Sequence, residues 1–201
     1  MQCKDFTKII GAKTYDSFYQ TLSQYDCQRC GLGKDRTQIV IHRGDPSAKI
    51  VFVGEAPGAQ EDATGKPFVG RAGKMLDACL RAAGFDIEND LFIMNVVKCR
   101  PPKNRVPTLE EATSCRPFLE RQLKLVRPCV IGLLGATALK HLAPEVKKKA
   151  MKDTVGQILP KTVQREFALM VLYHPAALLY DPSKKSIFLR HLKKMRQQFG
   201  D

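Results

Sequence analysis

The sequence contains no run of about eighteen consecutive apolar residues, which is the length that a helix needs to cross a membrane. Its first residues contain no apolar segment of the kind found in secretory signals. We therefore expect no membrane partner and a cytoplasmic location. Repeats and low-complexity tracts are absent, and the composition (44% hydrophobic, 26% charged) excludes disordered, collagen-like and coiled-coil chains. The 201 residues are expected to form one domain, 1–201, with an N-terminal helical extension over 1–26.

Acidic residues are scarce relative to basic ones. Twenty Asp and Glu against 33 Lys and Arg leave a formal net charge of +13. Residues 140–198 alone contain thirteen basic and four acidic residues, including the run 147–149 and the basic face of the last predicted helix. A solvated helix face is one interpretation of such runs. Phosphate neutralisation is the other, and a field of this sign favours nucleic acid as a partner.

Seven cysteines are many for a chain without a secretion signal, because a reducing compartment disfavours disulfides. Cys3, Cys79 and Cys129 have the ordinary interpretation of tail or small core residues. The candidate ligands are Cys27, Cys30, Cys99 and Cys115. Four thiolates suit tetrahedral zinc or an iron–sulfur cluster. The long separation within the second pair favours the larger cluster, but the spacing leaves the metal open.

Buried apolar runs alternate with amphipathic segments along the chain. Strands are predicted over 50–53, 91–94, 129–134 and 168–173. Helices are predicted over 14–26, 71–83, 108–126, a short stretch after 135, and from a Ser183 cap onward. Residues 54–70 are expected to form a turn-rich loop. This alternation predicts a parallel sheet covered by helices on both faces.

Polar residues follow three of these strands where each strand ends. Glu55 follows the first strand, Asn95 the second and His174 the fourth. Because the carboxyl ends of parallel strands share one edge of a sheet, we expect these side chains to converge there. Taken singly, a loop carboxylate is usually solvated and a lone histidine is usually structural. The loop at 54–70 lacks the lysine and hydroxyl pair of a phosphate-binding loop, which excludes that class of NTPase.

Several motifs occur together and in order from about Cys27 to the C-terminus. They are Cys27-x-x-Cys30, 54–62 (GEAPGAQED), 65–70 (GKPFVG), 95–107 (NVVKCRPPKNRVP) and 174–176 (HPA). This set closely resembles the family 4 uracil-DNA glycosylases, which are iron–sulfur enzymes of bacteria and archaea. The resemblance implies an α/β fold, a three-layer α/β/α sandwich with a central four-stranded parallel sheet. It also implies a 4Fe–4S cluster held by Cys27, Cys30, Cys99 and Cys115.

The resemblance further implies hydrolysis of the N-glycosidic bond of deoxyuridine in DNA, the first step of base-excision repair. Uracil is released and an abasic site remains, after the base has been flipped out of the stack. Phe68 would stack on uracil, and the Asn95 amide would read O4 and N3–H. His174 would donate a hydrogen bond to O2 as negative charge develops on the leaving base. Glu55 would act on the attacking water and the oxocarbenium-like sugar.

Other positions in the same motifs carry weaker assignments. Glu61 would crowd the 5-methyl group of thymine, and Gly54 and Gly58 would also contact the base. Ala56 stands where other branches of the superfamily keep an aspartate, which weakens the assignment of Glu55 as the group that activates water.

The DNA-binding surface is expected around the same motifs, with uracil-containing DNA, single- or double-stranded, as the partner of a monomeric protein. Leu178 or Leu179 would wedge into the gap left by the flipped base. The segment after His174 reads PAALLY where the family often has PSxxLR, so a hydroxyl and a charge are missing from the expected contacts. The predicted phosphate contacts are Arg100, Lys103, Arg105, Lys184 and Lys185.

Three alternatives remain. A related glycosylase would take hypoxanthine or xanthine instead of uracil. A non-catalytic iron–sulfur protein would bind DNA or carry electrons, although electron carriers are usually acidic and this chain is basic. A third branch forms a covalent adduct with uracil-DNA through a histidine in an extra loop, and no such insertion lies between Arg100 and Pro107.

Overall fold

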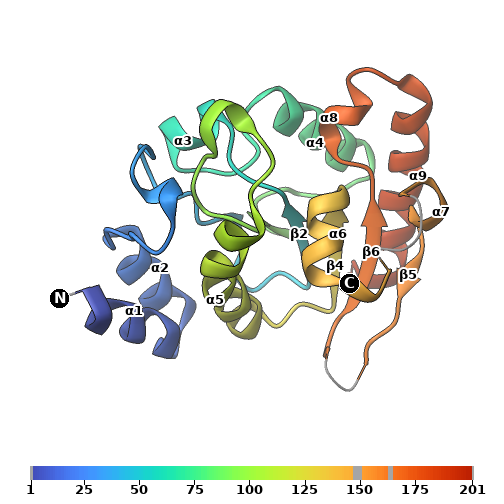
Figure 1. Cartoon of the computed structure of the whole chain (residues 1–201). Helices are drawn as coiled ribbons and strands as arrows, with labels where there is room; N and C mark the ends of the chain where they lie inside the picture. Colours follow the sequence, from blue (N-terminus) through green and yellow to red (C-terminus); the bar gives the residue numbers. More distant parts are fainter. Residues whose placement is uncertain (1, 147–150, 163–164, 201) are drawn as a thin grey trace.

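The computed structural model describes residues 2–146, 151–162 and 165–200, so the predicted basic run 147–149 lies outside the described residues. Six strands form one sheet in the order β1-β3-β2-β4-β6-β5 (Figure 1). The strands are β1 (Arg43–Gly44), β2 (Ile50–Gly54), β3 (Leu91–Asn95), β4 (Val130–Leu134), β5 (Ile158–Leu159) and β6 (Ala168–Leu172).

The four long strands lie side by side and are parallel, as predicted. The sheet has six strands rather than four because β1 and β5 pair antiparallel at its two edges. Each edge strand is two residues long, which is too short to carry an apolar pattern in the sequence.

The helices connect the strands and cover both faces of the sheet. The helices are α1 (Gln2–Gly11), α2 (Tyr15–Ser23), α3 (Ala59–Thr64), α4 (Arg71–Ala82), α5 (Leu109–Val126), α6 (Ala136–Leu142), α7 (Met151–Thr154), α8 (Pro175–Leu178) and α9 (Pro182–Phe199). Short 3-10 turns lie at η1 (Gly31–Gly33), η2 (Pro102–Asn104) and η3 (Pro144–Val146). Within the described ranges, none of these helices combines the length and the apolarity that a membrane crossing requires.

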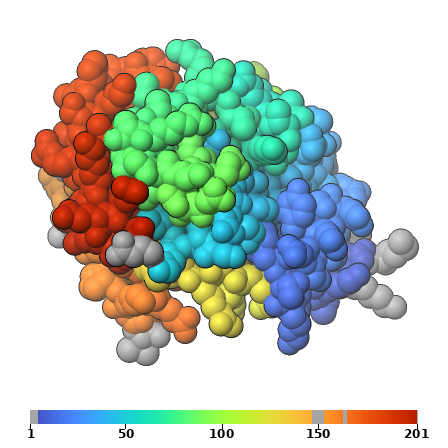
Figure 2. Space-filling model, turned by 180° about the vertical axis from the view of Figure 1, so that it is seen from behind, coloured from blue at the N-terminus to red at the C-terminus, as the bar shows by residue number. Residues whose placement is uncertain are grey.

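Two hydrophobic clusters confirm the three-layer α/β/α arrangement. Alternate strand residues such as Val51 and Val53 pack with α1, α2, α5 and α6. The intervening residues, such as Ile50 and Phe52, pack with α4, α8 and α9 on the opposite face. Seen from behind, the C-terminal helix borders the segment that follows α4, and the N-terminal helices lie on the other side of the molecule (Figure 2). A parallel sheet covered on both faces exposes its functional edge at the strand ends.

Three local expectations are corrected. The loop expected over 54–70 contains α3, and the helix expected over 14–26 ends at Ser23. The last helix begins at Pro182 and is capped by the Asp181 carboxylate, which accepts the Ser183 N–H; Ser183 itself is not the cap. The Thr108–Glu111 capping box at the start of α5 is confirmed.

Candidate active site

The carboxyl ends of β2, β3 and β6 bring the predicted polar residues together, as expected. Gly54 and Asn95 are paired in register as the last residues of β2 and β3. Glu55 directly follows β2, and His174 lies two residues beyond β6. The Val96 and Val97 N–H groups donate to the Gly54 and Glu55 carbonyls at 2.9 and 3.3 Å, which extends the pairing beyond the sheet. We call Gly54, Glu55, Phe68, Asn95 and His174 the base site.

Phe68 enters the base site from the loop between α3 and α4. Its backbone is left-handed, with φ 56°, which is uncommon for a residue other than glycine. The ring centroid lies 6.0 Å from that of His174. A Cβ on Gly54 would overlap the Phe68 ring and lie 2.6 Å from Asn95 Oδ1. Glycine is therefore required at residue 54, because the ring and the amide both lie against its α-carbon.

Glu61 holds the loop that carries Phe68. Its carboxylate is buried and accepts the N–H groups of Gly58, Val69 and Gly70 at 3.0, 2.9 and 2.8 Å. Both carboxylate oxygens are used inside the loop. The structure thus gives Glu61 a positioning role, while its predicted contact with the thymine methyl group stays a prediction.

Asn95 presents an unsatisfied acceptor to the base site. The residue is 1% exposed, and its Oδ1 atom is buried without a hydrogen-bond partner among the described residues. Buried amide oxygens are normally paired, so this one is available to accept a hydrogen bond from a bound base. An amide offers one acceptor and two donors, which suits a base edge that presents both a donor and an acceptor.

The His174 ring is oriented by main-chain contacts. Its Nδ1 atom accepts the Ala176 N–H at 3.2 Å at the start of α8. Burial lowers the pKa of His174, and the nearby Glu55 carboxylate only partly opposes this effect. The neutral ring must then carry its proton on Nε2. Gly135 leaves room for the base of the His174 side chain, because a Cβ there would lie 2.9 Å from His174 Cβ.

Glu55 is held by a residue that the sequence does not indicate. The Thr137 hydroxyl, in the first turn of α6, donates to Glu55 Oε2. Thr137 is 8% exposed. The only sequence signal was the position of α6 directly after Gly135, at the same sheet edge.

The four predicted ligand cysteines line one small cavity. We call Cys27, Cys30, Cys99 and Cys115 the cysteine cage. Within the described ranges, no three His, Cys, Asp or Glu side chains converge tightly enough for a single metal ion. Thiols spaced around a cavity fit a polynuclear cluster better than a tetrahedral zinc ion.

Cys99 and Cys115 are buried and Cys27 and Cys30 are half-buried, and cations border the cage. Burial raises the pKa of Cys99 to about 12 and that of Cys115 to about 11. Burial also raises the pKa of Cys27, and Arg36 only partly opposes the rise at Cys27 and Cys99. Arg29 and Lys98 also line the cavity. Thiolates that bind a metal must lose their protons, and neighbouring cations favour that loss. The donor set therefore fits a four-thiolate metal group.

The predicted phosphate contacts near the cage differ in their availability. Arg105 forms a two-pronged ion pair with Glu111, at 2.6 and 2.8 Å, which lowers the pKa of that carboxyl. Arg100 donates to the Asn104 side chain at 2.8 Å. Lys103 is exposed, with φ 53° at the turn η2. Of the three, Lys103 is the most accessible to a phosphate.

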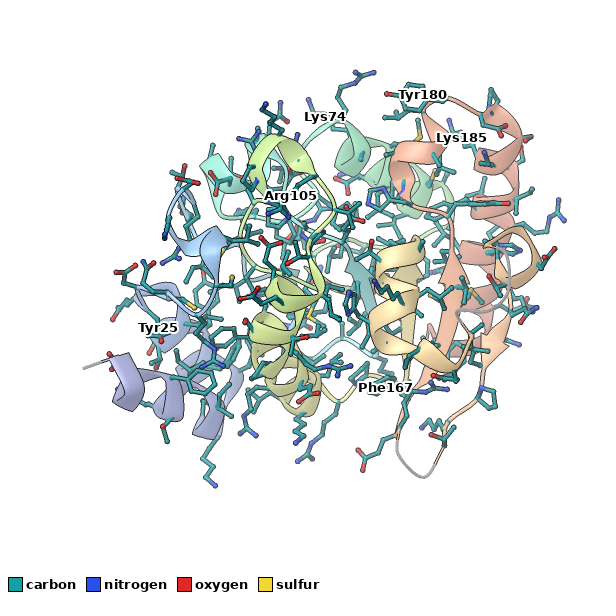
Figure 3. The ribbon with its side chains drawn as sticks, viewed as in Figure 1. Tyr25, Lys74, Arg105, Phe167, Tyr180 and Lys185 are labelled. Atoms are coloured by element: carbon teal, nitrogen blue, oxygen red, sulfur yellow. The ribbon has the colours of Figure 1, made fainter. Side chains whose placement is uncertain are left out.

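The segment from α8 to α9 exposes a residue that was not predicted. Leu178 is 3% exposed and packs in the second hydrophobic cluster, so its insertion into DNA would open that core. Leu179 is half-buried, whereas Tyr180 is 81% exposed. Lys184 pairs with Asp181 at 3.0 Å, and Lys185 is exposed. Tyr180, Lys185 and Lys74 lie toward one end of the molecule, and Phe167 lies toward the other (Figure 3).

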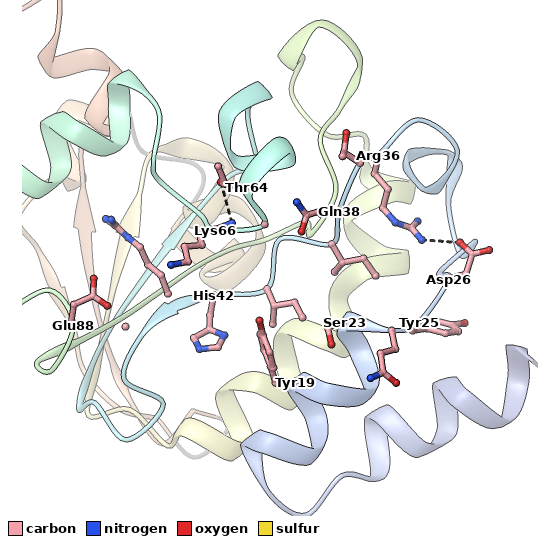
Figure 4. A pocket seen from close by; sticks show the side chains of 17 residues that line it. Tyr19, Ser23, Tyr25, Asp26, Arg36, Gln38, His42, Thr64, Lys66 and Glu88 are labelled. Carbon is pink, nitrogen blue, oxygen red and sulfur yellow. Dashed lines mark hydrogen bonds and ion pairs between the residues drawn. The ribbon is translucent and has the colours of Figure 1, made fainter.

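A separate cavity of about 620 Å³ lies beside the edge strand β1 (Figure 4). Its lining includes Tyr19, His42 and Lys66, and Arg36 and Asp26 form an ion pair of 3.0 Å beside it. The base site residues do not line it. This cavity is therefore distinct from the site predicted from the strand ends.

Known proteins resemble this chain over most of its length. A family model described as the uracil DNA glycosylase superfamily matches residues 41–199. A type-4 uracil-DNA glycosylase of Sulfurisphaera tokodaii is 40% identical, over 85% of this chain and 79% of that protein. The proteins of the same name from Archaeoglobus fulgidus and Thermotoga maritima are 40% and 41% identical, over 87% and 85% of this chain and 88% of each relative.

Proposed function

The chain belongs to the uracil DNA glycosylase superfamily, and we propose that it removes uracil from DNA by hydrolysing the N-glycosidic bond of deoxyuridine. In this reaction the bond between C1′ and N1 breaks, water adds to C1′, and the departing base takes up a proton. The products are free uracil and an abasic site. The observation that carries the proposal is the convergence of Phe68, Asn95 and His174 at one edge of the sheet.

Recognition of the base requires that it leave the helix, since its edge and face are otherwise covered by neighbouring bases. The Phe68 ring supplies a stacking surface, and the Asn95 amide lies against the same α-carbon, that of Gly54. The amide can donate to O4 and accept from N3–H through its orphaned Oδ1 atom. Cytosine presents the reverse pattern, so the same amide disfavours it.

His174 stabilises the leaving group. The Nε2–H bond is the ring's available donor, because Nδ1 is occupied by the Ala176 N–H. A donor aimed at O2 strengthens as negative charge develops on the departing uracil, and one such donor is worth about 3 kcal/mol in the transition state. A neutral ring suffices for this role, in agreement with the lowered pKa of His174.

Glu55 acts on the sugar side. Thr137 occupies its Oε2 atom and fixes the carboxylate, which leaves Oε1 to orient the water and to stabilise positive charge on the sugar. Ala56, partly buried against the first hydrophobic cluster, supplies no second carboxylate.

The cysteine cage would hold a 4Fe–4S cluster through Cys27, Cys30, Cys99 and Cys115. When bound, the cluster supplies a covalent cross-link between the segment before η1, the segment after β3 and helix α5. The turn η2, with Lys103, lies between the last two of these segments. We further propose that the whole chain acts as one domain and that the protein is a cytoplasmic monomer that binds uracil-containing DNA.

A base-release assay tests the function. Labelled oligonucleotides with a single uracil, hypoxanthine, xanthine or thymine are incubated with the protein, and abasic sites are cleaved with alkali. We expect cleavage at uracil, and a rate about a hundredfold to a thousandfold lower in the His174→Ala variant. Cleavage only at hypoxanthine or xanthine would favour the related glycosylase. Undiminished uracil release by His174→Ala would refute the assigned site.

A further inference from the structure

Lys98 is a buried lysine that the reaction described above does not use. It is 1% exposed and is among the largest fully buried side chains of the protein. It lies between Val97 and Cys99, three residues after Asn95. Lysine is almost never fully buried unless its ammonium is paired, so this position requires an explanation.

Three contacts fix Lys98 between the base site and the cysteine cage. Its Nζ atom donates to the Asn95 main-chain carbonyl at 2.7 Å. Its own carbonyl accepts the Val40 N–H at 2.8 Å, and its main-chain N–H donates to the Cys115 sulfur. The side chain also lines the cavity of the cage. One residue therefore contacts both the base-reading asparagine and a cage ligand.

The charge of Lys98 is matched by the cage. Among the residues that the structure describes, no carboxylate forms an ion pair with it. Its side chain lines the same cavity as the four cysteines of the cage, whose thiolates would supply the opposing charge. Four thiolates around a doubly positive cluster core leave a net charge of −2, which a buried ammonium partly neutralises. Buried charges persist where such partners exist.

We propose that Lys98 is a positioning residue that couples the cysteine cage to the base site, holding the Asn95 backbone while the bound cluster holds Lys98. The position of the Asn95 side chain depends on that of its backbone, which is already constrained by pairing with Gly54. A shift of the carbonyl therefore moves the amide relative to the Phe68 ring. This inference rests on the proposed function for its effect on uracil, but not for its effect on the cluster.

The test compares Lys98→Met with Lys124→Met, in the iron-loaded full-length protein. Methionine keeps length without charge or donor, and Lys124 is an exposed residue near the end of α5. Three quantities are measured: iron and sulfide content, the reduction potential of the bound cluster, and the single-turnover rate of uracil release. A Lys98→Arg variant keeps the charge and the donors.

For Lys98→Met we expect a more negative reduction potential, because a positive charge beside the cluster is lost. We also expect uracil release about tenfold to a hundredfold slower, as displaced catalytic groups typically show, with little change in affinity for abasic product DNA. Lys124→Met should match the wild type in all three. If Lys98→Met loses its iron, Lys98→Arg should restore both iron and rate.

Other outcomes would overturn the inference. A fully loaded Lys98→Met protein with the wild-type rate would show that Asn95 does not need Lys98. An unchanged potential would remove the link to the cage, and Lys98→Arg that behaves like Lys98→Met would indicate a steric effect alone. If the wild type releases no uracil, the proposed function fails, yet the potential still decides whether Lys98 faces the cluster.

Discussion

A single main-chain hydrogen bond determines which nitrogen of His174 carries the proton. The Ala176 N–H points at Nδ1 at 3.2 Å, so protonating Nδ1 would set two donors against each other. Burial disfavours the charged ring as well, and lowers its pKa. The neutral tautomer with its proton on Nε2 is thus the resting state of this side chain, and it is the form that can donate to a leaving base.

The pH dependence of uracil release follows from this tautomer. We predict a constant rate as the pH falls through about 6.5, the ordinary pKa of histidine, and a decline only at lower pH. The reason is that a lowered pKa keeps His174 neutral until the solution is more acidic, so that Nδ1 continues to accept the Ala176 N–H. Single-turnover rates across the acidic range measure the inflection. The His174→Gln variant keeps a hydrogen-bond donor without a titrating ring, so its pH profile should lack this inflection. An inflection above pH 6.5 in the wild type would contradict the prediction.

A substitution at Gly54 tests the close approach of the Phe68 ring and the Asn95 amide to this residue. In Gly54→Ala the new Cβ would displace the Phe68 ring or Asn95 Oδ1, so we predict uracil release about a hundredfold slower. Stability should fall by about 1–3 kcal/mol, because the added methyl group overpacks a site whose neighbours Phe68 and Asn95 are both buried. Gly11→Ala is the control, since a Cβ there meets no atom within 4 Å. Equal rates in the two variants would show that the ring is not held where the structure has it.

Among the polar residues of the base site, strand periodicity predicts those that lie at or just beyond a strand end. Glu55, Asn95 and His174 each follow a long apolar strand, so their convergence could be predicted. Thr137 and Lys98 give no such signal, because a hydroxyl in a short helix and a lysine between valine and cysteine fit no pattern. Thr137 contacts a residue 82 positions away in the chain, and Lys98 contacts a residue three positions away. Only the folded chain shows in which direction these side chains point.

Among the elements, α3 shows how a helix can be hidden in a polar sequence. It is six residues long and its buried residues are Glu61 and Asp62, so no apolar stripe predicts it. Its stability derives from carboxylates that accept main-chain N–H groups, including Thr37 N–H at 3.0 and 3.1 Å from Asp62. By contrast, α5 could be predicted because its capping box and apolar positions are local features.

The turn between α8 and α9 carries the exposed Tyr180, for which we predict a role in duplex DNA. An aromatic ring can stack on a neighbouring base when the target base is extruded. Tyr180→Ala should therefore slow uracil release from duplex DNA several-fold, and change release from single strands little, since single strands need no wedge. Tyr19→Ala, a partly exposed tyrosine of α2, is the control. An equal loss on both substrates would indicate disturbed packing instead.

The cysteine cage joins elements that are otherwise distant in the chain, so its loss should affect them together. We predict that Cys115→Ala loses its iron and unfolds at a lower temperature, because α5 is no longer cross-linked to the segment after β3. Cys79→Ala removes a buried cysteine of α4 outside the cage and should keep its iron. Visible absorbance and thermal unfolding measure both effects. Full iron in Cys115→Ala would remove that residue from the ligand set.

For the whole molecule, alternation of strands and helices predicts the layers but not the order of strands. The order β3-β2-β4-β6 places β2 at the centre, between β3 and β4, and this arrangement decides that Gly54 lies beside Asn95. Several topologies satisfy the same alternation, because each parallel connection can cross to either side of the starting strand. The resemblance to a family, rather than periodicity, distinguishes among them.

The net charge of +13 belongs to the molecule as a whole. The salt dependence of DNA affinity distinguishes the effect of this overall charge from that of individual phosphate contacts. Each phosphate contact contributes a slope of about −0.9 to the dependence of log affinity on log salt for duplex DNA. Affinity for uracil-free duplex should therefore fall steeply with salt, and Lys103→Gln and Lys185→Gln should each lower the slope by about 1.

Lys124→Gln provides the matched control, because it removes the same charge from the end of α5 that precedes β4, at the sheet edge opposite the base site. If DNA lies across the carboxyl ends of the strands, this control leaves the slope unchanged while lowering the overall field by one charge. Equal changes in all three variants would mean that binding follows net charge alone and that the DNA has no fixed path over the base site.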